Sequence, residues 1–339
     1  MKILVTGGAG FIGSAFVRKM AKKNHVVLVD KLTYAGDLAR VNTVFNRLKF
    51  YKEDIVNADR LEKIFSDQKP EFVINFAAET HVDRSILDPN NFILSNVYGT
   101  LNLLNLALKY KTKKFIQIST DEVYGELLSK KSQAFKEIDL LLPNSPYSAS
   151  KAGAEMLVRS FMQTYGLSTV ILRPSNNYGY WQYPEKLIPL TISKILMQEK
   201  IPVYGNGKNI RTWLFVDDCV NAIIKIMVKG IPGEIYNIGG NEEVTNIELI
   251  GKILKIMNKK NDLIEFVPDR LGHDFRYAVN SVKTKNRIGQ YCRISLDEGL
   301  RSTVDWYLSN KKWLFSKKKE MENFAKKLKM KSSSLKDKK

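Results

Sequence analysis

The fold is decided by the stretch Lys2-Ile3-Leu4-Val5-Thr6-Gly7-Gly8-Ala9-Gly10-Phe11-Ile12-Gly13, near the start of the chain. Its first five residues are typical of a short buried strand, and an apolar pattern with helical spacing follows through Met20. Between them, Gly7, Gly10 and Gly13 are spaced three residues apart. In a strand–turn–helix unit such glycines permit the tight turn, let the backbone approach a pyrophosphate, and let the helix pack on the strand. The stretch therefore predicts a phosphate-binding loop at a helix N-terminus.

Acidic residues follow the next two strand-like runs. Residues 26–29 lead to Asp30, where a carboxylate can hydrogen-bond an adenosine ribose, which favours NAD over NADP. The adjacent Lys31 is the one feature that favours NADP. Residues 48–51 lead to Asp54, which could either contact the adenine or cap the helix that follows.

Further strand-like runs at residues 72–76, 115–119 and 169–172 alternate with helical patterns, such as the one at residues 96–108. This alternation predicts an α/β fold of the Rossmann type, with a doubly wound parallel sheet. After about residue 175 the alternation becomes less regular, which we interpret as a smaller C-terminal lobe that covers the substrate. We expect a mainly NAD-binding domain over residues 1–175. Residues 176–310 should form mainly the substrate-binding lobe with crossings back to the first domain, and residues 311–339 a basic, frayed tail.

Charge and composition limit the classes of partner. The formal net charge of the 339 residues is +19, and residues 311–339 alone contain twelve lysines and three acids. This tail could be a polybasic arm for nucleic acid or a membrane surface, but chain ends are commonly solvated, and we expect neither partner. No apolar run reaches the roughly 18 residues of a membrane span. With only two cysteines, a disulfide framework and a structural zinc site are both unexpected, so the sequence indicates a cytoplasmic protein without a metal.

Two polar motifs follow the strand at residues 115–119. Thr120, Asp121 and Glu122 come directly after it, and Tyr147 and Lys151 lie one helical turn apart on a predicted helix. A Lys ammonium lowers the pKa of a neighbouring phenol, so this pair can act as a general base for a hydroxyl beside a nicotinamide. Ligands of open α/β sheets bind at the carboxyl ends of the strands, so these motifs and the glycine-rich loop should face one crevice.

Together these motifs resemble the extended short-chain dehydrogenase/reductase family. Within it, the acid pair resembles that of the dTDP-glucose 4,6-dehydratases, since sugar-nucleotide epimerases usually carry other residues there. The resemblance runs from residue 1 to about residue 305 and implies NAD as a prosthetic group. It implies that Tyr147 takes a proton from the C4 hydroxyl, Glu122 removes the C5 proton, and Asp121 protonates the departing C6 hydroxyl. Thr120 would hydrogen-bond the C4 oxygen, and Lys151 would support Tyr147.

The resemblance also implies the binding residues. The cofactor would contact Gly7, Gly10, Phe11, Ile12, Gly13, Asp30, Lys31, Leu32, Thr33, Asp54, Ile55, Ala77, Ala78, Tyr147, Lys151 and Asn177. The sugar nucleotide would contact Thr80, His81, Thr120, Asn176, Lys186, Leu187, Pro202, Val203, Tyr204, Arg211, Asn246 and His273. A homodimer through the helices at residues 101–109 and 152–161 is expected by analogy.

Other readings stay open on the sequence alone. The family usually has Asp where this chain has Thr212, and Gly-Pro-Tyr where it has Tyr180-Trp181. The nucleotide could be uridine rather than thymidine. A 4-epimerase of the same fold is the enzymatic alternative, and an inactive NAD-sensing regulator is the alternative from another class. The acid pair opposes the first, and the intact Tyr147 and Lys151 oppose the second.

Overall fold

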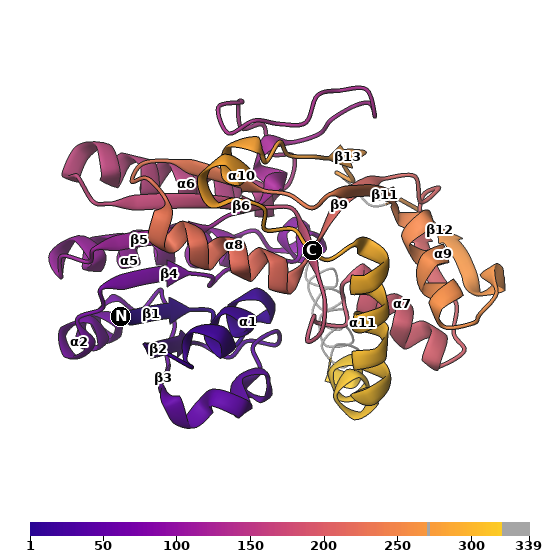
Figure 1. Ribbon diagram of the computed structural model, residues 1–339, viewed down its shortest axis with the longest axis horizontal. Helices are drawn as coiled ribbons and strands as arrows, with labels where there is room; N and C mark the ends of the chain where they lie inside the picture. Colours follow the sequence, from indigo (N-terminus) through magenta and orange to yellow (C-terminus); the bar gives the residue numbers. More distant parts are fainter. Residues whose placement is uncertain (270–271, 321–339) are drawn as a thin grey trace, which may run out of the picture.

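A computed structural model describes residues 1–269 and 272–320. Its main feature is a seven-stranded sheet with the order β10-β6-β5-β4-β1-β2-β3, in which all neighbours run parallel (Figure 1). The strands are β1 (Lys2–Thr6), β2 (His25–Asp30), β3 (Leu48–Lys52), β4 (Phe72–Asn75), β5 (Lys114–Ile118), β6 (Thr169–Pro174) and β10 (Ile235–Ile238). The predicted doubly wound parallel sheet is confirmed.

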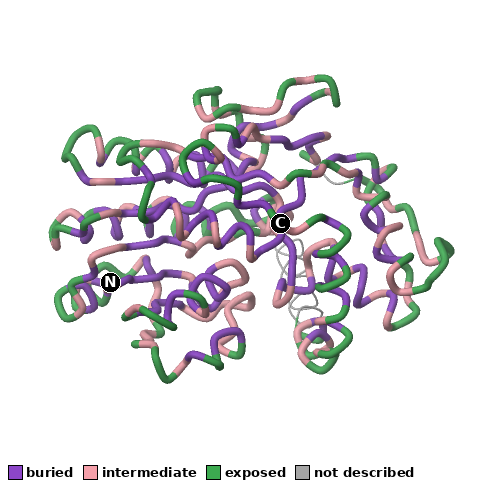
Figure 2. Tube along the Cα trace, viewed as in Figure 1, coloured by how far each residue is buried: buried purple, intermediate pink, exposed green. Residues whose placement is uncertain are grey.

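Helices cover both faces of this sheet, which is why its strands consist of almost continuous apolar residues. One face packs against α1 (Phe11–Met20), the 3₁₀ helix η1 (Leu38–Arg47), α8 (Val216–Lys229) and α10 (Val282–Ile288). The other face packs against α2 (Ala58–Gln68), α5 (Gly99–Lys109) and α6 (Pro146–Tyr165). Apart from the edge strand β3, the strands are accordingly buried along most of their length (Figure 2).

The chain reverses direction across the sheet between β1 and β4. From β1 it proceeds to β2 and β3 on one side, and then returns to β4, β5 and β6 on the other. The loops that follow β1 and β4 therefore diverge and leave a crevice at the carboxyl ends of the strands. The seventh strand, β10, follows a long excursion, as expected for a chain that crosses between two lobes.

That excursion and the chain after β10 together build the smaller lobe, seen at the right of Figure 1. Strand β9 (Ile210–Phe215) pairs with β7 (Asn176–Tyr178), β11 (Glu242–Thr245) and β13 (Arg276–Tyr277), and β8 (Ile201–Tyr204) pairs with β12 (Ile264–Val267). Helices α7 (Leu187–Leu196), α9 (Asn246–Ile256) and α11 (Leu296–Ser309) enclose a separate apolar core with these strands. Shorter helical elements are α3 (Val82–Leu87), α4 (Asn90–Phe92), η2 (Ile93–Tyr98), η3 (Asp121–Tyr124) and η4 (Asn261–Leu263).

Residues 311–320, which the sequence assigns to a frayed tail, are helical and packed. Leu314 is fully buried in the core of the smaller lobe, and Trp313 packs beside that core. Three consecutive apolar residues, Trp313-Leu314-Phe315, interrupt the lysines here and supply the surface that packs. The rest of the tail, from residue 321, lies outside the described residues.

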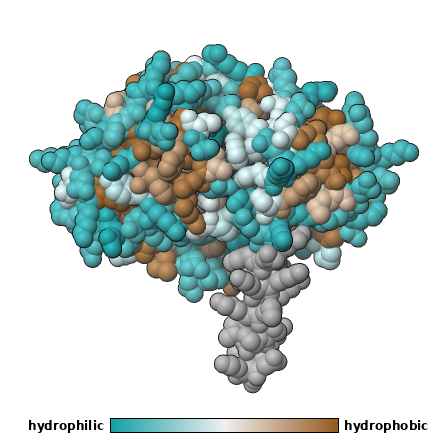
Figure 3. Space-filling model, turned by 90° about the horizontal axis from the view of Figure 1, so that it is seen from below, coloured by the Kyte–Doolittle hydropathy of each residue, from teal (hydrophilic) through white to brown (hydrophobic). Residues whose placement is uncertain are grey.

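The surface is mixed in character. Figure 3 shows hydrophobic patches set among hydrophilic side chains on one face. Among the described residues, no helix combines the length and the hydrophobicity that a membrane span requires.

Candidate active site at the carboxyl ends of the strands

A single cavity lies where β1, β4 and β5 end, and the motifs from the sequence meet in it. Its walls come from the glycine-rich loop, the loop after β2, the segments after β4 and β5, helix α6, and the segment after β6. The predicted residues that line it are Gly7, Gly10, Phe11, Ile12, Gly13, Asp30, Lys31, Thr33, Asp54, Ile55, Ala77, Ala78, Thr80, Thr120, Asp121, Glu122, Tyr147, Lys151, Asn176, Asn177 and Lys186.

The glycine-rich loop leaves its backbone open to this cavity. Gly7 has a φ of +66°, and a Cβ there would lie 2.5 Å from the backbone nitrogen of Ala77. A Cβ at Gly13 would lie 2.4 Å from the carbonyl oxygen of Gly7, so this glycine allows α1 to approach β1 closely. A Cβ at Gly10 would meet only that same oxygen, at 3.1 Å. The loop is thus a cradle into which a pyrophosphate can settle against the start of α1.

Asp30 joins two loops that border the cavity. Its carboxylate accepts hydrogen bonds from the backbone N–H of Ala9, at 2.9 Å, and of Leu32, at 2.8 Å. Burial raises the pKa of Asp30, and these two N–H groups oppose the rise. The neighbouring Lys31 ammonium lies 3.6 Å from Asp54 and 3.4 Å from Glu79. Because two carboxylates already surround Lys31, it is poorly placed to favour a 2′-phosphate.

The acid pair begins the short helix η3. Thr120 caps this helix, because its hydroxyl accepts a hydrogen bond from the backbone N–H of Glu122. Asp121 is only 3% exposed, whereas Glu122 is less deeply buried. Burial, assisted by the negative charge of Glu122, raises the pKa of Asp121 to about 7, while Arg211 opposes the rise. The site therefore holds two adjacent carboxyl groups of which Asp121 is half protonated near neutral pH.

Helix α6 brings the Tyr-Lys pair to the same place. Pro146 stands in its first turn, and Ser145 and Ser148 form a reciprocal cap that fixes where the helix begins. Tyr147 and Lys151 are both buried. Thr120 and the charges of Glu122 and Asp121 all act on the pKa of the Tyr147 phenol, so the phenol lies close to the acid pair.

The electrostatics of this pair differ from the expectation. The sequence predicts that Lys151 lowers the pKa of Tyr147, but burial and the charge of Glu122 raise it. The Lys151 ammonium donates instead to the backbone carbonyl of Ile118, at 2.6 Å. Burial in turn lowers the pKa of Lys151 to about 8.

Most of the residues expected to bind the sugar nucleotide lie outside this cavity. His81, Leu187, Pro202, Val203, Tyr204, Arg211, Asn246, His273 and, from the cofactor set, Leu32 are not among its lining residues. Most of them belong to the smaller lobe. Arg211 donates to the carbonyl oxygens of Asp274, at 2.9 Å, and Phe275, at 3.2 Å, and its guanidinium lies 4.4 Å from the centre of the Tyr277 ring. Thr212, where the family usually has Asp, donates to the carbonyl of Tyr277.

Other lining residues carry no local sequence signal. Glu185 is buried and accepts hydrogen bonds from Tyr34, at 3.1 Å, and Arg84, at 3.5 Å, while His81 lies 3.7 Å away. Arg40, at 1% exposure, also lines the cavity. Contacts between segments that are far apart in the sequence bring Glu185 and Arg40 to the cavity. No local sequence motif predicts such contacts.

Several buried polar atoms around the cavity have no hydrogen-bond partner within the described parts of the chain. They are Ser119 Oγ, Asp121 Oδ2, Asn176 Oδ1, Asn177 Oδ1, Gln182 Oε1 and Arg40 Nη2. Buried polar groups in proteins are nearly always paired. Their concentration here, together with the glycine cradle, fits a large polar ligand such as a dinucleotide.

Comparisons with known proteins agree with this geometry. The family model described as GDP-mannose 4,6 dehydratase matches residues 4–303. The dTDP-glucose 4,6-dehydratase of Neisseria meningitidis serogroup B is 45% identical over 336 residues, covering 92% of this chain and 94% of that protein. The corresponding Escherichia coli enzyme is 44% identical, covering 92% and 95%.

Solved structures give the same result. DesIV, a dTDP-glucose 4,6-dehydratase from Streptomyces venezuelae with NAD bound, is 41% identical with a TM-score of 0.89 and covers 92% of this chain and 98% of its own. A UDP-glucose 4-epimerase from Thermotoga maritima is 33% identical with a TM-score of 0.86, covering 91% and 99%. The chain therefore belongs to the GDP-mannose 4,6-dehydratase family, within the extended short-chain dehydrogenases/reductases.

Proposed function

We propose that the protein is an NAD-dependent dTDP-glucose 4,6-dehydratase, which removes water from dTDP-glucose to give dTDP-4-keto-6-deoxyglucose. The observation that carries the proposal is the buried Asp121, with a pKa raised to about 7, beside Glu122 and Tyr147 in one cavity. An elimination needs one carboxyl group that is protonated and one that is ionised. The similarity to dehydratases along nearly the whole chain supports the same conclusion.

The cofactor would lie across the carboxyl ends of β1 and β4. The glycine cradle would hold its pyrophosphate, and Asp30 and Asp54 border the place of its adenosine half. When bound, NAD supplies a hydride acceptor for C4 of the sugar and a hydride donor for C6, so it leaves the cycle in the state in which it entered.

Tyr147 would take the proton of the C4 hydroxyl, which lets this carbon become a ketone. The Thr120 hydroxyl contacts Tyr147 and would orient the same substrate oxygen. Lys151 lies one helical turn further along α6, where its positive charge would stabilise the phenolate that forms. The buried setting favours the neutral phenol, so this stabilisation is needed for Tyr147 to act as a base.

The acid pair would carry out the elimination. The C4 ketone makes the C5 proton acidic, and Glu122 would remove it. The C6 hydroxyl departs as water with the proton of Asp121, so one proton is taken up and one is given back by neighbouring carboxyl groups. This division of roles follows burial, because the more deeply buried Asp121 is the one that holds a proton near neutral pH.

A single incubation series tests the function. Purified protein is offered dTDP-glucose, UDP-glucose or GDP-mannose with NAD, and the 4-keto-6-deoxy product is detected by its absorbance in alkali. We expect product from dTDP-glucose at the highest kcat/KM. Preferred turnover of UDP-glucose would keep the reaction but change the nucleotide, and a 4-epimer without a ketone would establish the epimerase alternative.

We also propose a homodimer through α5 and α6. Leu94 and Tyr98 on η2 are 49% and 45% exposed, and Met156 on α6 is 48% exposed. Because η2 packs directly on α6, these side chains form an apolar surface that a second copy can cover.

A further inference from the structure

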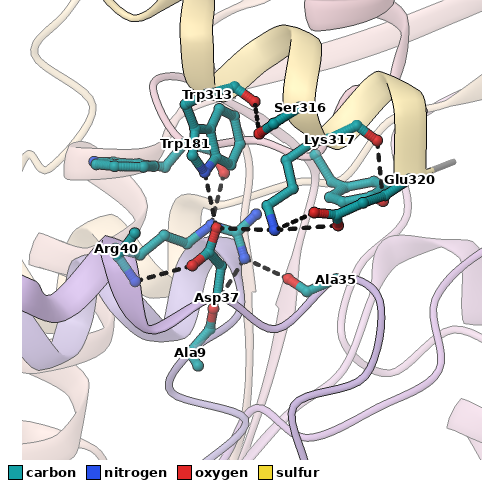
Figure 4. Close-up of polar contacts among 11 residues, drawn as sticks. Ala9, Ala35, Asp37, Arg40, Trp181, Trp313, Ser316, Lys317 and Glu320 are labelled. Atoms are coloured by element: carbon teal, nitrogen blue, oxygen red, sulfur yellow. Dashed lines mark hydrogen bonds and ion pairs between the residues drawn. The ribbon is translucent and has the colours of Figure 1, made fainter.

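The helical segment after α11, residues 310–320, links the smaller lobe to the cofactor domain. We call it the C-terminal segment. Leu314 anchors it in the core of the smaller lobe. Its other side faces the loop between β2 and η1, residues 31–37 (Figure 4). The family match ends at residue 303, before this segment begins.

Asp37 receives the polar contacts of the C-terminal segment. The indole Nε1–H of Trp313 donates to Asp37 Oδ2 at 2.8 Å, and the Lys317 ammonium lies 3.3 Å from the same oxygen. The other oxygen, Asp37 Oδ1, caps η1 by accepting from the N–H of Ala39. Asp37 thus holds the start of η1 with one oxygen and the C-terminal segment with the other.

Arg40 receives the ring contacts. Its guanidinium lies 5.5 Å from the centre of the Trp313 ring, and its Nε donates to the carbonyl of Trp181 at 3.0 Å. Trp181 in turn packs against Trp313, with ring centres 5.1 Å apart, and against Trp306 on α11, at 4.6 Å. Trp181 is one of the positions at which this chain departs from the family pattern, and it joins the same cluster.

From Asp37 and Arg40 the contacts continue directly into the cofactor site. The N–H of Asp37 and the Nη1 of Arg40 both donate to the carbonyl of Ala9, at 3.0 and 2.9 Å. Arg40 also donates to the carbonyl of Ala35. Ala9 lies inside the glycine-rich loop, and its own N–H donates to Asp30. The C-terminal segment is therefore two contacts away from the glycine-rich loop and three contacts away from Asp30.

The segment has more than a packing role in the smaller lobe. If Trp313 only filled that core, its indole N–H would have no reason to meet a carboxylate of the other domain, and Lys317 would point to solvent. Instead both converge on Asp37, whose irregular loop borders the cavity through Lys31, Thr33 and Gly36. Irregular loops open at little free-energy cost, so this loop is held by the contacts of its side chains. Tyr34 contacts Glu185 and Tyr183 at one end, and Asp37 contacts the C-terminal segment at the other.

We infer that the C-terminal segment is a positioning element of the cofactor site, in which Trp313 and Lys317 hold Asp37 and Arg40 so that the loop at residues 31–37 closes on NAD. The inference uses the NAD site alone and does not depend on the dehydratase reaction. Slow release of NAD suits a reaction that returns the cofactor unchanged in each cycle. Substrate binding to the smaller lobe would act on the same contacts, because that lobe anchors the segment.

The test measures the dissociation constant of NAD for the full-length protein freed of cofactor. Trp313→Phe keeps the ring and removes the N–H donor, and Lys317→Gln removes the ammonium. Each should weaken NAD binding by roughly tenfold, the usual worth of a hydrogen bond or ion pair to a charged group. Lys312→Gln, at an exposed position of the same helix, is the matched control for the loss of one positive charge and should leave NAD affinity within about twofold.

A double-mutant cycle with Asp37→Asn tests whether Trp313 and Lys317 act on the NAD site through Asp37. In the Asp37→Asn background, Trp313→Phe and Lys317→Gln should cause almost no further loss, because the partner carboxylate is gone. Unchanged NAD affinity in folded Trp313→Phe and Lys317→Gln proteins would overturn the inference. Equal losses in Lys312→Gln, or in a chain that ends at Glu320, would overturn it too, since they would assign the effect to overall charge. Because the experiment measures NAD binding, its result supports or overturns the inference even if the protein fails to dehydrate dTDP-glucose.

Discussion

Asp121 and Glu122 are adjacent residues with the same functional group, and their surroundings set them apart. Asp121 is buried, while Glu122 is only partly buried and lines the cavity. Burial therefore raises the pKa of Asp121 into the neutral range. The sequence predicts the pair and its place after a strand, but the assignment of acid and base depends on which carboxyl group is buried, and the tertiary structure decides that.

Glu122→Gln tests whether Glu122 is the base that removes the C5 proton. The amide cannot remove the C5 proton, whereas oxidation at C4 does not require Glu122. We expect NAD to be reduced on mixing with dTDP-glucose while the overall rate falls by roughly 10²- to 10⁴-fold. Stopped-flow absorbance of the reduced nicotinamide, followed beside product formation, makes the measurement. Full turnover by this variant would remove Glu122 from the mechanism.

Asp121→Asn tests the acid. In the unaltered protein, kcat should decline as the pH rises through about 7, because the proton that leaves with the C6 hydroxyl is then lost from Asp121. In Asp121→Asn the amide cannot replace this proton, so kcat should fall by roughly 10²- to 10⁴-fold and this limb of the pH profile should vanish. A variant that keeps the same decline above neutral pH would show that another group supplies the proton.

Asp121→Asn should also stabilise the folded protein above neutral pH. The folded state holds this proton more tightly than the unfolded chain, whose Asp pKa is about 3.9. Its contribution to stability is therefore complete below that pH and is lost as the pH rises through about 7. Denaturant unfolding at pH 8 should show Asp121→Asn to be more stable by roughly 2–4 kcal/mol, with the difference shrinking toward pH 4. Equal stability at both pH values would contradict the raised pKa.

At the scale of elements, the strand–loop–helix unit at residues 2–20 was predictable because its signals are local. Three glycine positions, an apolar strand and an apolar helix face are each readable within a few residues. The same holds for α6, whose cap and Tyr-Lys spacing lie within one turn. The segment at residues 311–320 was missed because its lysines dominate the composition, whereas three apolar residues decide its packing.

We expect Gly13 to serve helix packing and Gly10 to serve NAD binding. A matched pair of alanine substitutions distinguishes these two roles. In Gly13→Ala the new Cβ would press on the carbonyl of Gly7 at 2.4 Å, so we expect a loss of stability of roughly 1–3 kcal/mol. In Gly10→Ala the Cβ meets the same oxygen at 3.1 Å and otherwise faces open space. This protein should fold with near-normal stability but bind NAD at least tenfold more weakly. Thermal unfolding and NAD titration of both variants check this, and equal effects in both would refute the division.

At the scale of the whole molecule, the strands of the parallel sheet were predictable one by one, whereas the smaller lobe was predictable only as a region of irregular pattern and not in its strand pairing. An apolar run in the sequence predicts each strand of the sheet, and strands and helices simply alternate along the chain in parallel α/β folds. The smaller lobe joins short strands from distant segments, such as β7 with β9 and β8 with β12. Contacts of this kind, including Glu185 with Tyr34 and Arg40 with Trp181, leave no periodic pattern in the sequence.

The proposed homodimer through α5 and α6 can be tested by a single substitution in its apolar surface. Met156→Glu places a charge in the middle of the apolar surface on α6 and η2, and it should shift the protein toward monomer by at least tenfold in dimer dissociation constant. Val228→Glu is the control, since Val228 is an exposed apolar residue of α8, on the opposite face of the sheet. Light scattering coupled to size-exclusion chromatography gives the masses. A protein that is monomeric without substitution, or a dimer that Met156→Glu leaves intact, would contradict the assignment.

In the proposed mechanism, one cavity oxidises C4, eliminates water across C5 and C6, and reduces C6 of the same sugar. A direct measurement uses dTDP-glucose with deuterium at C4 and locates the label in the product by NMR. Hydride transfer from C4 to C6 predicts deuterium on the C6 methyl group and a proton from solvent at C5. Deuterium that remains at C4, in substrate or in a 4-epimer, would contradict it.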